Sequence, residues 1–80
     1  MRYPNLKYRV DASHVGADDV LDAKIERRAG RPPLGTGFSC TDRRRDLGFG
    51  FVNKSAALRA AARIRTLRGV RAAVRRLETA

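Results

Sequence analysis

The side chains best suited to chemistry in this sequence cluster in one segment, between Asp42 and Val52. Three consecutive arginines, at positions 43 to 45, stand shortly before Phe49 and Phe51, and glycines alternate with the two phenylalanines. Guanidinium groups bind phosphate, and aromatic rings stack on unpaired bases. The segment therefore brings together the two kinds of side chain that a nucleic-acid-binding surface needs.

The charge of the chain points in the same direction. Its 80 residues include 18 lysines and arginines against 8 aspartates and glutamates, for a net charge of +10. Fifteen of the cations are arginines, whose planar guanidinium pairs bidentately with phosphate and stacks on rings. Residues 1–40 carry seven cations and five anions, whereas residues 41–80 carry eleven and three. This distribution favours an anionic partner: nucleic acid first, an acidic protein surface second and a membrane surface third.

Six elements that would position these side chains can be predicted from periodicity and breakers. Alternation predicts strands, helical spacing predicts helices, and Gly30 with Pro32 and Pro33 ends the first helix. The predicted order is a strand at 6–12, a helix at 17–29, strands at 38–41 and 47–52, a helix from 53 or 55 to about 67, and a strand at 70–75. A chain of this length forms one domain, residues 1–80.

This order is typical of the ferredoxin-like βαββαβ sandwich, an α+β fold in which two helices cover one face of a four-stranded antiparallel sheet. Right-handed crossovers then place the first and third strands in the middle. If Tyr8 and Val10 face the helices, Lys7 and Arg9 lie on the open face. In the last strand, the same alternation turns Arg71 and Arg75 outward.

The third strand allows two interpretations. Phe49 and Phe51 share one side, and Gly48 and Gly50 share the other. Since a shift of one residue exchanges the faces, the rings either fill the core or stand on the open face among the cations. The alanine-rich second helix leaves room for large rings, which favours the core. The glycines would let that helix approach the sheet closely, which favours the open face.

The run from Gly48 to Val52 resembles the RNP1 strand of RNA recognition motif (RRM) domains, whose pattern is basic-Gly-aromatic-Gly/Ala-aromatic-Val-x-aromatic. Leu47 and Lys54 occupy the positions of the opening basic residue and the closing aromatic residue. The resemblance implies that Phe49 and Phe51 are base-stacking rings on the open face of the sheet.

Few residues suggest catalysis or a cofactor. His14 has no metal-ligand spacing to other residues and is expected in a loop. Cys40 is the single cysteine, which excludes an internal disulfide, and we expect it to be a small buried hydrophobe. We therefore expect neither an enzyme nor a cofactor or metal site. The sequence has no apolar run long enough for a membrane span and no signal peptide at its start, so we expect a cytoplasmic protein.

Together these features predict a nucleic-acid-binding domain, with RNA or single strands favoured over duplex DNA. Phe49 and Phe51 would stack on bases, and the phosphates would contact Lys7, Arg9, Arg71 and Arg75. Arg43, Arg44 and Arg45 would form a flanking clamp at the turn between the second and third strands. The alternative is a protein-binding inhibitor or adaptor, such as a phage-encoded anti-CRISPR protein acting on a nucleic-acid-handling complex.

Overall fold

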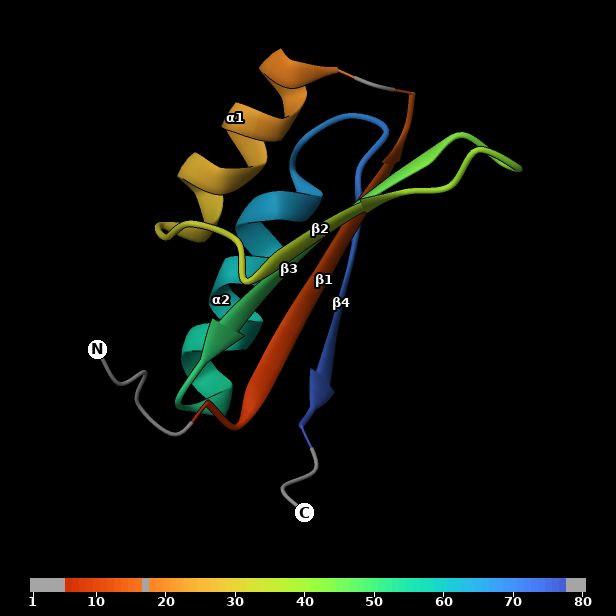
Figure 1. Ribbon diagram of the computed structural model, residues 1–80. Coiled ribbons are helices and arrows are strands. Elements are labelled where there is room, and N and C mark those ends of the chain that lie inside the picture. The colour runs from red at the N-terminus through yellow and green to blue at the C-terminus, as the bar shows by residue number, and fades with distance from the viewer. Residues whose placement is uncertain (1–5, 17, 78–80) are drawn as a thin grey trace.

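The structure, a computed structural model, describes residues 6–16 and 18–77. Its elements are β1 (Tyr8–Val15), α1 (Asp19–Ala29), β2 (Gly35–Phe38), β3 (Arg44–Phe51), α2 (Lys54–Arg65) and β4 (Arg71–Arg76). The strands form one antiparallel sheet in the order β2-β3-β1-β4. Both helices lie on the same side of this sheet, and the other face is open (Figure 1). The predicted α+β architecture and strand order are thereby confirmed.

Local signals in the sequence explain where both helices begin and how the first one ends. The Asp18 side chain caps α1 by accepting a hydrogen bond from the Leu21 amide, and Asn53 caps α2 in the same way at Ala56. Helix α1 ends at Gly30, which adopts a left-handed backbone with φ 77° and donates to the Glu26 carbonyl. Ala17, where the first helix is predicted to begin, lies outside the described residues.

The strand boundaries differ from the prediction, most of all in β1, β2 and β3. Strand β2 covers Gly35–Phe38 rather than 38–41, because its pairing with β3 uses the two glycines, which carry little strand preference of their own. Strand β1 runs on to Val15, and β3 already begins at Arg44. The turn between β2 and β3 is therefore Ser39–Arg43, and it projects beyond the rest of the sheet (Figure 1).

The largest correction concerns Phe49 and Phe51. Both rings face the helices and are buried, with 0% and 2% of their surface exposed, so they form no stacking platform on the open face. They pack with the sheet residues Val10 and Leu47 against the small side chains of α2, namely Ala57, Ala60 and Ala61.

Size complementarity explains this register. A helix face built of alanine leaves space that only large side chains can fill at normal packing density. Burying a phenylalanine side chain stabilises the fold by about 1.5–3 kcal/mol, and few other large apolar residues are present to replace it. The guanidinium of Arg31 lies over the Phe51 ring, with Cζ 4.0 Å from the ring centroid.

Candidate nucleic-acid interface

Strand register sets which side chains meet on the open face. Asp11 lies opposite Gly48 of β3 on one side and Ala73 of β4 on the other. Ser13 lies opposite Asp46 and Arg71. The residues that alternate away from the buried Val10, Ala12 and Leu47 are Arg9, Asp11 and Ser13 from β1, Arg44, Asp46, Gly48 and Gly50 from β3, and Arg71, Ala73 and Arg75 from β4. We call this surface the open face.

Asp11 organises the centre of the open face. One of its carboxylate oxygens accepts from Nε of Arg9 at 2.6 Å, and the other lies 3.2 Å from Nε of Arg75. Each guanidinium meets the carboxylate through Nε, which leaves its terminal amino groups for other acceptors. A single acid thus orients two arginines on neighbouring strands without occupying their whole donor set.

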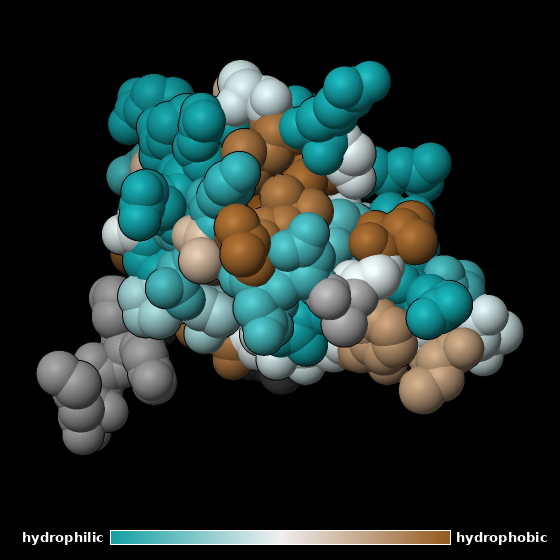
Figure 2. Space-filling view, turned by 90° about the horizontal axis from the view of Figure 1, so that it is seen from above, coloured by the Kyte–Doolittle hydropathy of each residue, from teal (hydrophilic) through white to brown (hydrophobic). Residues whose placement is uncertain are grey.

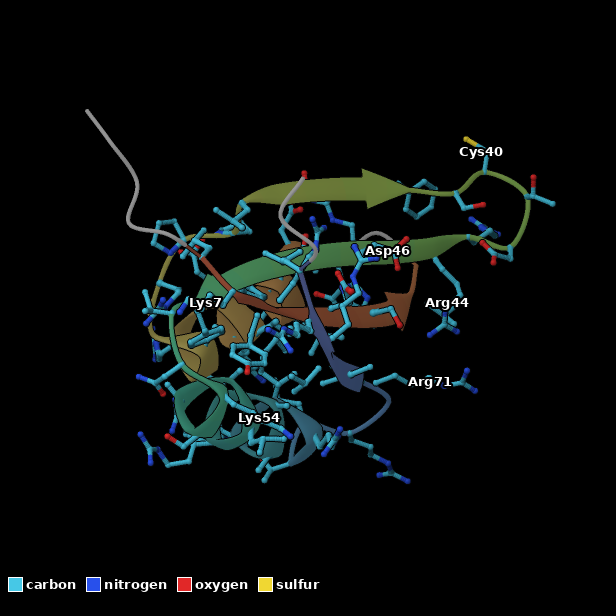
Figure 3. The ribbon with its side chains drawn as sticks, turned by 90° about the horizontal axis from the view of Figure 1, so that it is seen from below. Lys7, Cys40, Arg44, Asp46, Lys54 and Arg71 are labelled. Atoms are coloured by element: carbon cyan, nitrogen blue, oxygen red, sulfur yellow. The ribbon has the colours of Figure 1, made fainter. Side chains whose placement is uncertain are left out.

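A second group lies toward the end of β1. The Arg44 guanidinium donates to the Ser13 hydroxyl at 2.8 Å, and Arg71 is the cross-strand neighbour of Ser13. Figure 3 shows Arg44 and Arg71 pointing toward the same end of the sheet, with Lys7 at the opposite end. A hollow of about 640 Å³ is lined by Asp11, Ser13, Asp46, Arg65, Val70, Arg71, Ala72 and Ala73.

Lys7 extends the open face at the start of β1. Its amide donates to the Phe51 carbonyl at 3.0 Å, and its carbonyl accepts from the Leu77 amide at 2.8 Å, so the ladder continues one residue before the strand. Alternation with Tyr8 places the exposed Lys7 side chain on the open face. Five cations therefore share this surface with two carboxylates: Lys7, Arg9, Arg44, Arg71 and Arg75 against Asp11 and Asp46.

Glycines form the floor of this surface along β3 and β2. A Cβ on Gly48 would overlap with the guanidinium of Arg9, which lies over it. A Cβ on Gly50 would meet Leu6 and Leu34. Gly35 and Gly37 of β2 have open space where a side chain would be. The β2 edge of the open face is therefore low at Gly35 and Gly37, whereas Gly48 and Gly50 of β3 are buried beneath Arg9, Leu6 and Leu34.

The three consecutive arginines separate rather than forming one clamp. Arg44 lies on the open face, whereas Arg45 points to the helix side, where its Nε donates to Asp22 at 3.0 Å. Arg43 is in the turn, with a left-handed φ of 59°. Asp42 supports this turn: hydrogen bonds from the Ser39 side chain and the Arg44 amide hold the pKa of its carboxyl below the ordinary value. Its contribution to stability is therefore present above the ordinary pKa and is lost as pH falls through the lowered one.

His14 is not the loop residue that the sequence suggests. It belongs to β1, has 1% of its surface exposed, and its Nε2 lies 2.7 Å from the carboxylate of Asp22 in α1. The other oxygen of Asp22 accepts from Arg45, so the three residues fasten β1, α1 and β3 together. The eight-residue spacing between His14 and Asp22 crosses a turn, and no periodic pattern reveals it.

Other chemistry finds little support in the part of the chain that the structure covers. No group of three or more His, Cys, Asp and Glu side chains there is placed to hold a metal ion. Cys40 is exposed at the β2–β3 turn, contrary to expectation, because the turn projects away from the core (Figure 3). Neither described helix combines the length and the apolar character that crossing a bilayer requires.

Comparison with known proteins adds no relative: no family model, curated protein or solved structure matches this chain.

Proposed function

We propose that this domain binds nucleic acid through the open face, with Arg9, Arg44, Arg71, Arg75 and Lys7 contacting phosphates. The observation that carries the proposal is the pair of guanidinium groups held on Asp11, because they are aligned before any ligand arrives. Guanidinium groups fixed in this way lose less conformational entropy when they bind phosphate than free side chains do.

Single-stranded nucleic acid suits this surface better than a duplex does. Gly35 and Gly37 leave the β2 edge of the open face low, so a flexible strand can lie along the sheet with its phosphates over β1 and β4. The helices and strands used to read a duplex groove protrude from the protein surface, whereas the arginines held on Asp11 lie on the broad side of the sheet, away from the projecting β2–β3 turn. RNA and single-stranded DNA are the ligands to compare.

The test is fluorescence anisotropy with a labelled 12-nucleotide single strand, measured across a salt series. The variant Arg71→Gln/Arg75→Gln removes two cations from the open face. The matched control, Arg27→Gln/Arg59→Gln, removes two exposed cations from the helices and changes the net charge equally. We expect the open-face variant to weaken binding at least tenfold and to lower the magnitude of the salt slope by about 1.4, since each phosphate contact to a single strand contributes about 0.7.

Equal losses in the two variants would mean that net charge alone attracts the strand, and would overturn the assignment to the open face. Full binding in both variants, or none in the unmodified protein, would overturn the proposal itself.

A protein partner is the second candidate, and one observation favours it. All four residues of β2 are exposed, and this strand forms one edge of the sheet, where a strand of another protein can pair. The domain would then act as an inhibitor or adaptor on a nucleic-acid-handling complex. Purifying the tagged domain from lysate, with and without nuclease, separates the two candidates. A protein that co-purifies in stoichiometric amounts even after nuclease treatment favours the protein partner. Nucleic acid that co-purifies without nuclease, with no such protein present, favours the first proposal.

A further inference from the structure

We infer that Arg9 supplies the stacking plane of the open face: its guanidinium, lying over Gly48 and held by Asp11, receives an unpaired base of a single strand. This inference rests on the proposed function and adds to it the group that contacts the bases. Arginine planes stack on unpaired bases much as aromatic rings do. The two rings of β3 are unavailable for this role because both are buried.

The position of Arg9 over Gly48 is the first observation. Three guanidinium atoms, Nε, Cζ and one terminal nitrogen, lie at nearly equal distances from the place a Gly48 Cβ would occupy. The group therefore turns a face, rather than an edge or an end, toward the glycine. Only glycine leaves room for this arrangement, because any Cβ would overlap with the guanidinium.

The fixed orientation of Arg9 is the second observation. Its Nε donates to one carboxylate oxygen of Asp11 at 2.6 Å, and the other oxygen of Asp11 forms a salt bridge with Arg75. Contact with Gly48 below and the hydrogen bond at the side restrict rotation of the guanidinium plane. The group is thus oriented before binding, and a base that stacks on it has less side-chain entropy to remove.

The surroundings of Arg9 are the third observation. Its side chain keeps 31% of its surface exposed, and since one face of the guanidinium lies against Gly48, we assign part of this exposure to the opposite face, where a ligand would stack. Next along β3, Leu6 and Leu34 lie over Gly50, and Leu34 is 45% exposed. A base on Arg9 would therefore have a cationic plane beneath it and aliphatic carbon beside it. A paired base in a duplex is already stacked on its neighbours, so the ligand class is an unpaired base.

The experiment compares two labelled 10-nucleotide oligomers by fluorescence anisotropy at one salt concentration. One is oligoadenylate RNA, and the other is an abasic oligomer of the same length and phosphate charge. Stacking on a protein plane strengthens binding per base, so we expect unmodified protein to bind oligoadenylate about tenfold more tightly than the abasic oligomer. In Arg9→Lys, which keeps the charge but loses the plane, we expect this preference to fall to within about twofold; the readout is the ratio of the two affinities, because both oligomers carry the same phosphates.

Two glycine variants form a matched pair. Gly48→Ala places a methyl group where the flexible end of Arg9 lies, so it displaces the guanidinium while the charge of the surface stays the same. Gly37→Ala, on the neighbouring strand of the same face, adds its methyl group in open space. We expect the first variant to lose the preference for oligoadenylate and the second to keep it.

The outcomes distinguish the inference from the proposal on which it rests. If unmodified protein binds neither oligomer, the nucleic-acid function is wrong. If it binds both equally, or if Arg9→Lys keeps the preference, the function stands and the stacking role of Arg9 is wrong. If a variant fails to fold, the NMR resonance of the Arg9 Nε–H in the unmodified protein is measured instead. Oligoadenylate should shift this resonance by the ring current of a stacked base, and the abasic oligomer should not. Equal shifts with the two oligomers would overturn the inference.

Discussion

At the scale of single residues, the RRM-like pattern on β3 suggests that the phenylalanines face a ligand, but in the structure the glycines lie on that side and the phenylalanines lie in the core. The rings of Phe49 and Phe51 are structural, and the glycines between them shape the surface that faces a ligand. Alternation alone cannot distinguish these registers, because it fixes which residues share a face and not which face is covered. The decisive partner lies outside the strand, in the alanine face of α2, whose small side chains require large ones opposite.

The residue-scale prediction concerns Phe49. We expect Phe49→Ala to lower the free energy of unfolding by about 3–5 kcal/mol, because the ring is fully buried and its removal leaves a cavity. Urea denaturation followed by circular dichroism measures this loss. Phe49→Leu is the matched variant: it should fold with a smaller loss and bind a single strand as the unmodified protein does. A Phe49→Ala protein that kept its stability but lost binding would contradict the core assignment.

At the scale of elements, the topology was predictable and several boundaries were not. Alternating apolar residues in β1 and β4, helical spacing in α2 and the Gly30–Pro33 stop were sufficient to predict the order of elements. The start of β2 was wrong because its pairing is determined by β3 rather than by its own glycines. Of the proposed phosphate contacts, Arg9, Arg71 and Arg75 were assigned to the open face correctly, since strand alternation is local information.

The side-chain contacts that join different elements could not be predicted from the sequence. The bond between His14 and Asp22 joins β1 to α1, and Arg45 joins β3 to the same carboxylate. This network also explains why the arginine clamp was wrong, because Arg45 is committed to the helix side. Its members depend on which faces meet after folding, and no spacing rule within one element predicts that.

The element-scale prediction concerns Asp22. We expect Asp22→Ala to destabilise the fold by about 1–3 kcal/mol, since it leaves Nε2 of the buried His14 ring without its hydrogen-bond partner. Thermal unfolding near neutral pH measures the effect. Asp19→Ala, which removes an exposed acid from the same first turn of α1, is the control and should cost clearly less. Equal losses would show that the charge at the helix start matters and the His14 contact does not.

At the scale of the whole molecule, the two sides of the sheet have different tasks. The helix side holds the core and the His14 network, and the open face holds the arginines ordered by Asp11. Cations also occur on the helices, so net charge alone would attract a polyanion to many places. Seen from the end that carries the β2–β3 turn, the surface is mostly hydrophilic, with separate apolar areas (Figure 2). What distinguishes the open face is the pair of guanidinium groups, from Arg9 and Arg75, that a single carboxylate, Asp11, holds side by side.

Amide NMR spectra recorded during titration with a single-stranded RNA 12-mer test this distinction most directly. Saturable shifts should concentrate on the open-face strands, at Arg9, Asp11, Gly48, Arg71 and Ala73, while the exposed sides of α1 and α2 stay unchanged. Shifts spread evenly over both sides of the sheet, or confined to the helices, would contradict the assignment of binding to the open face.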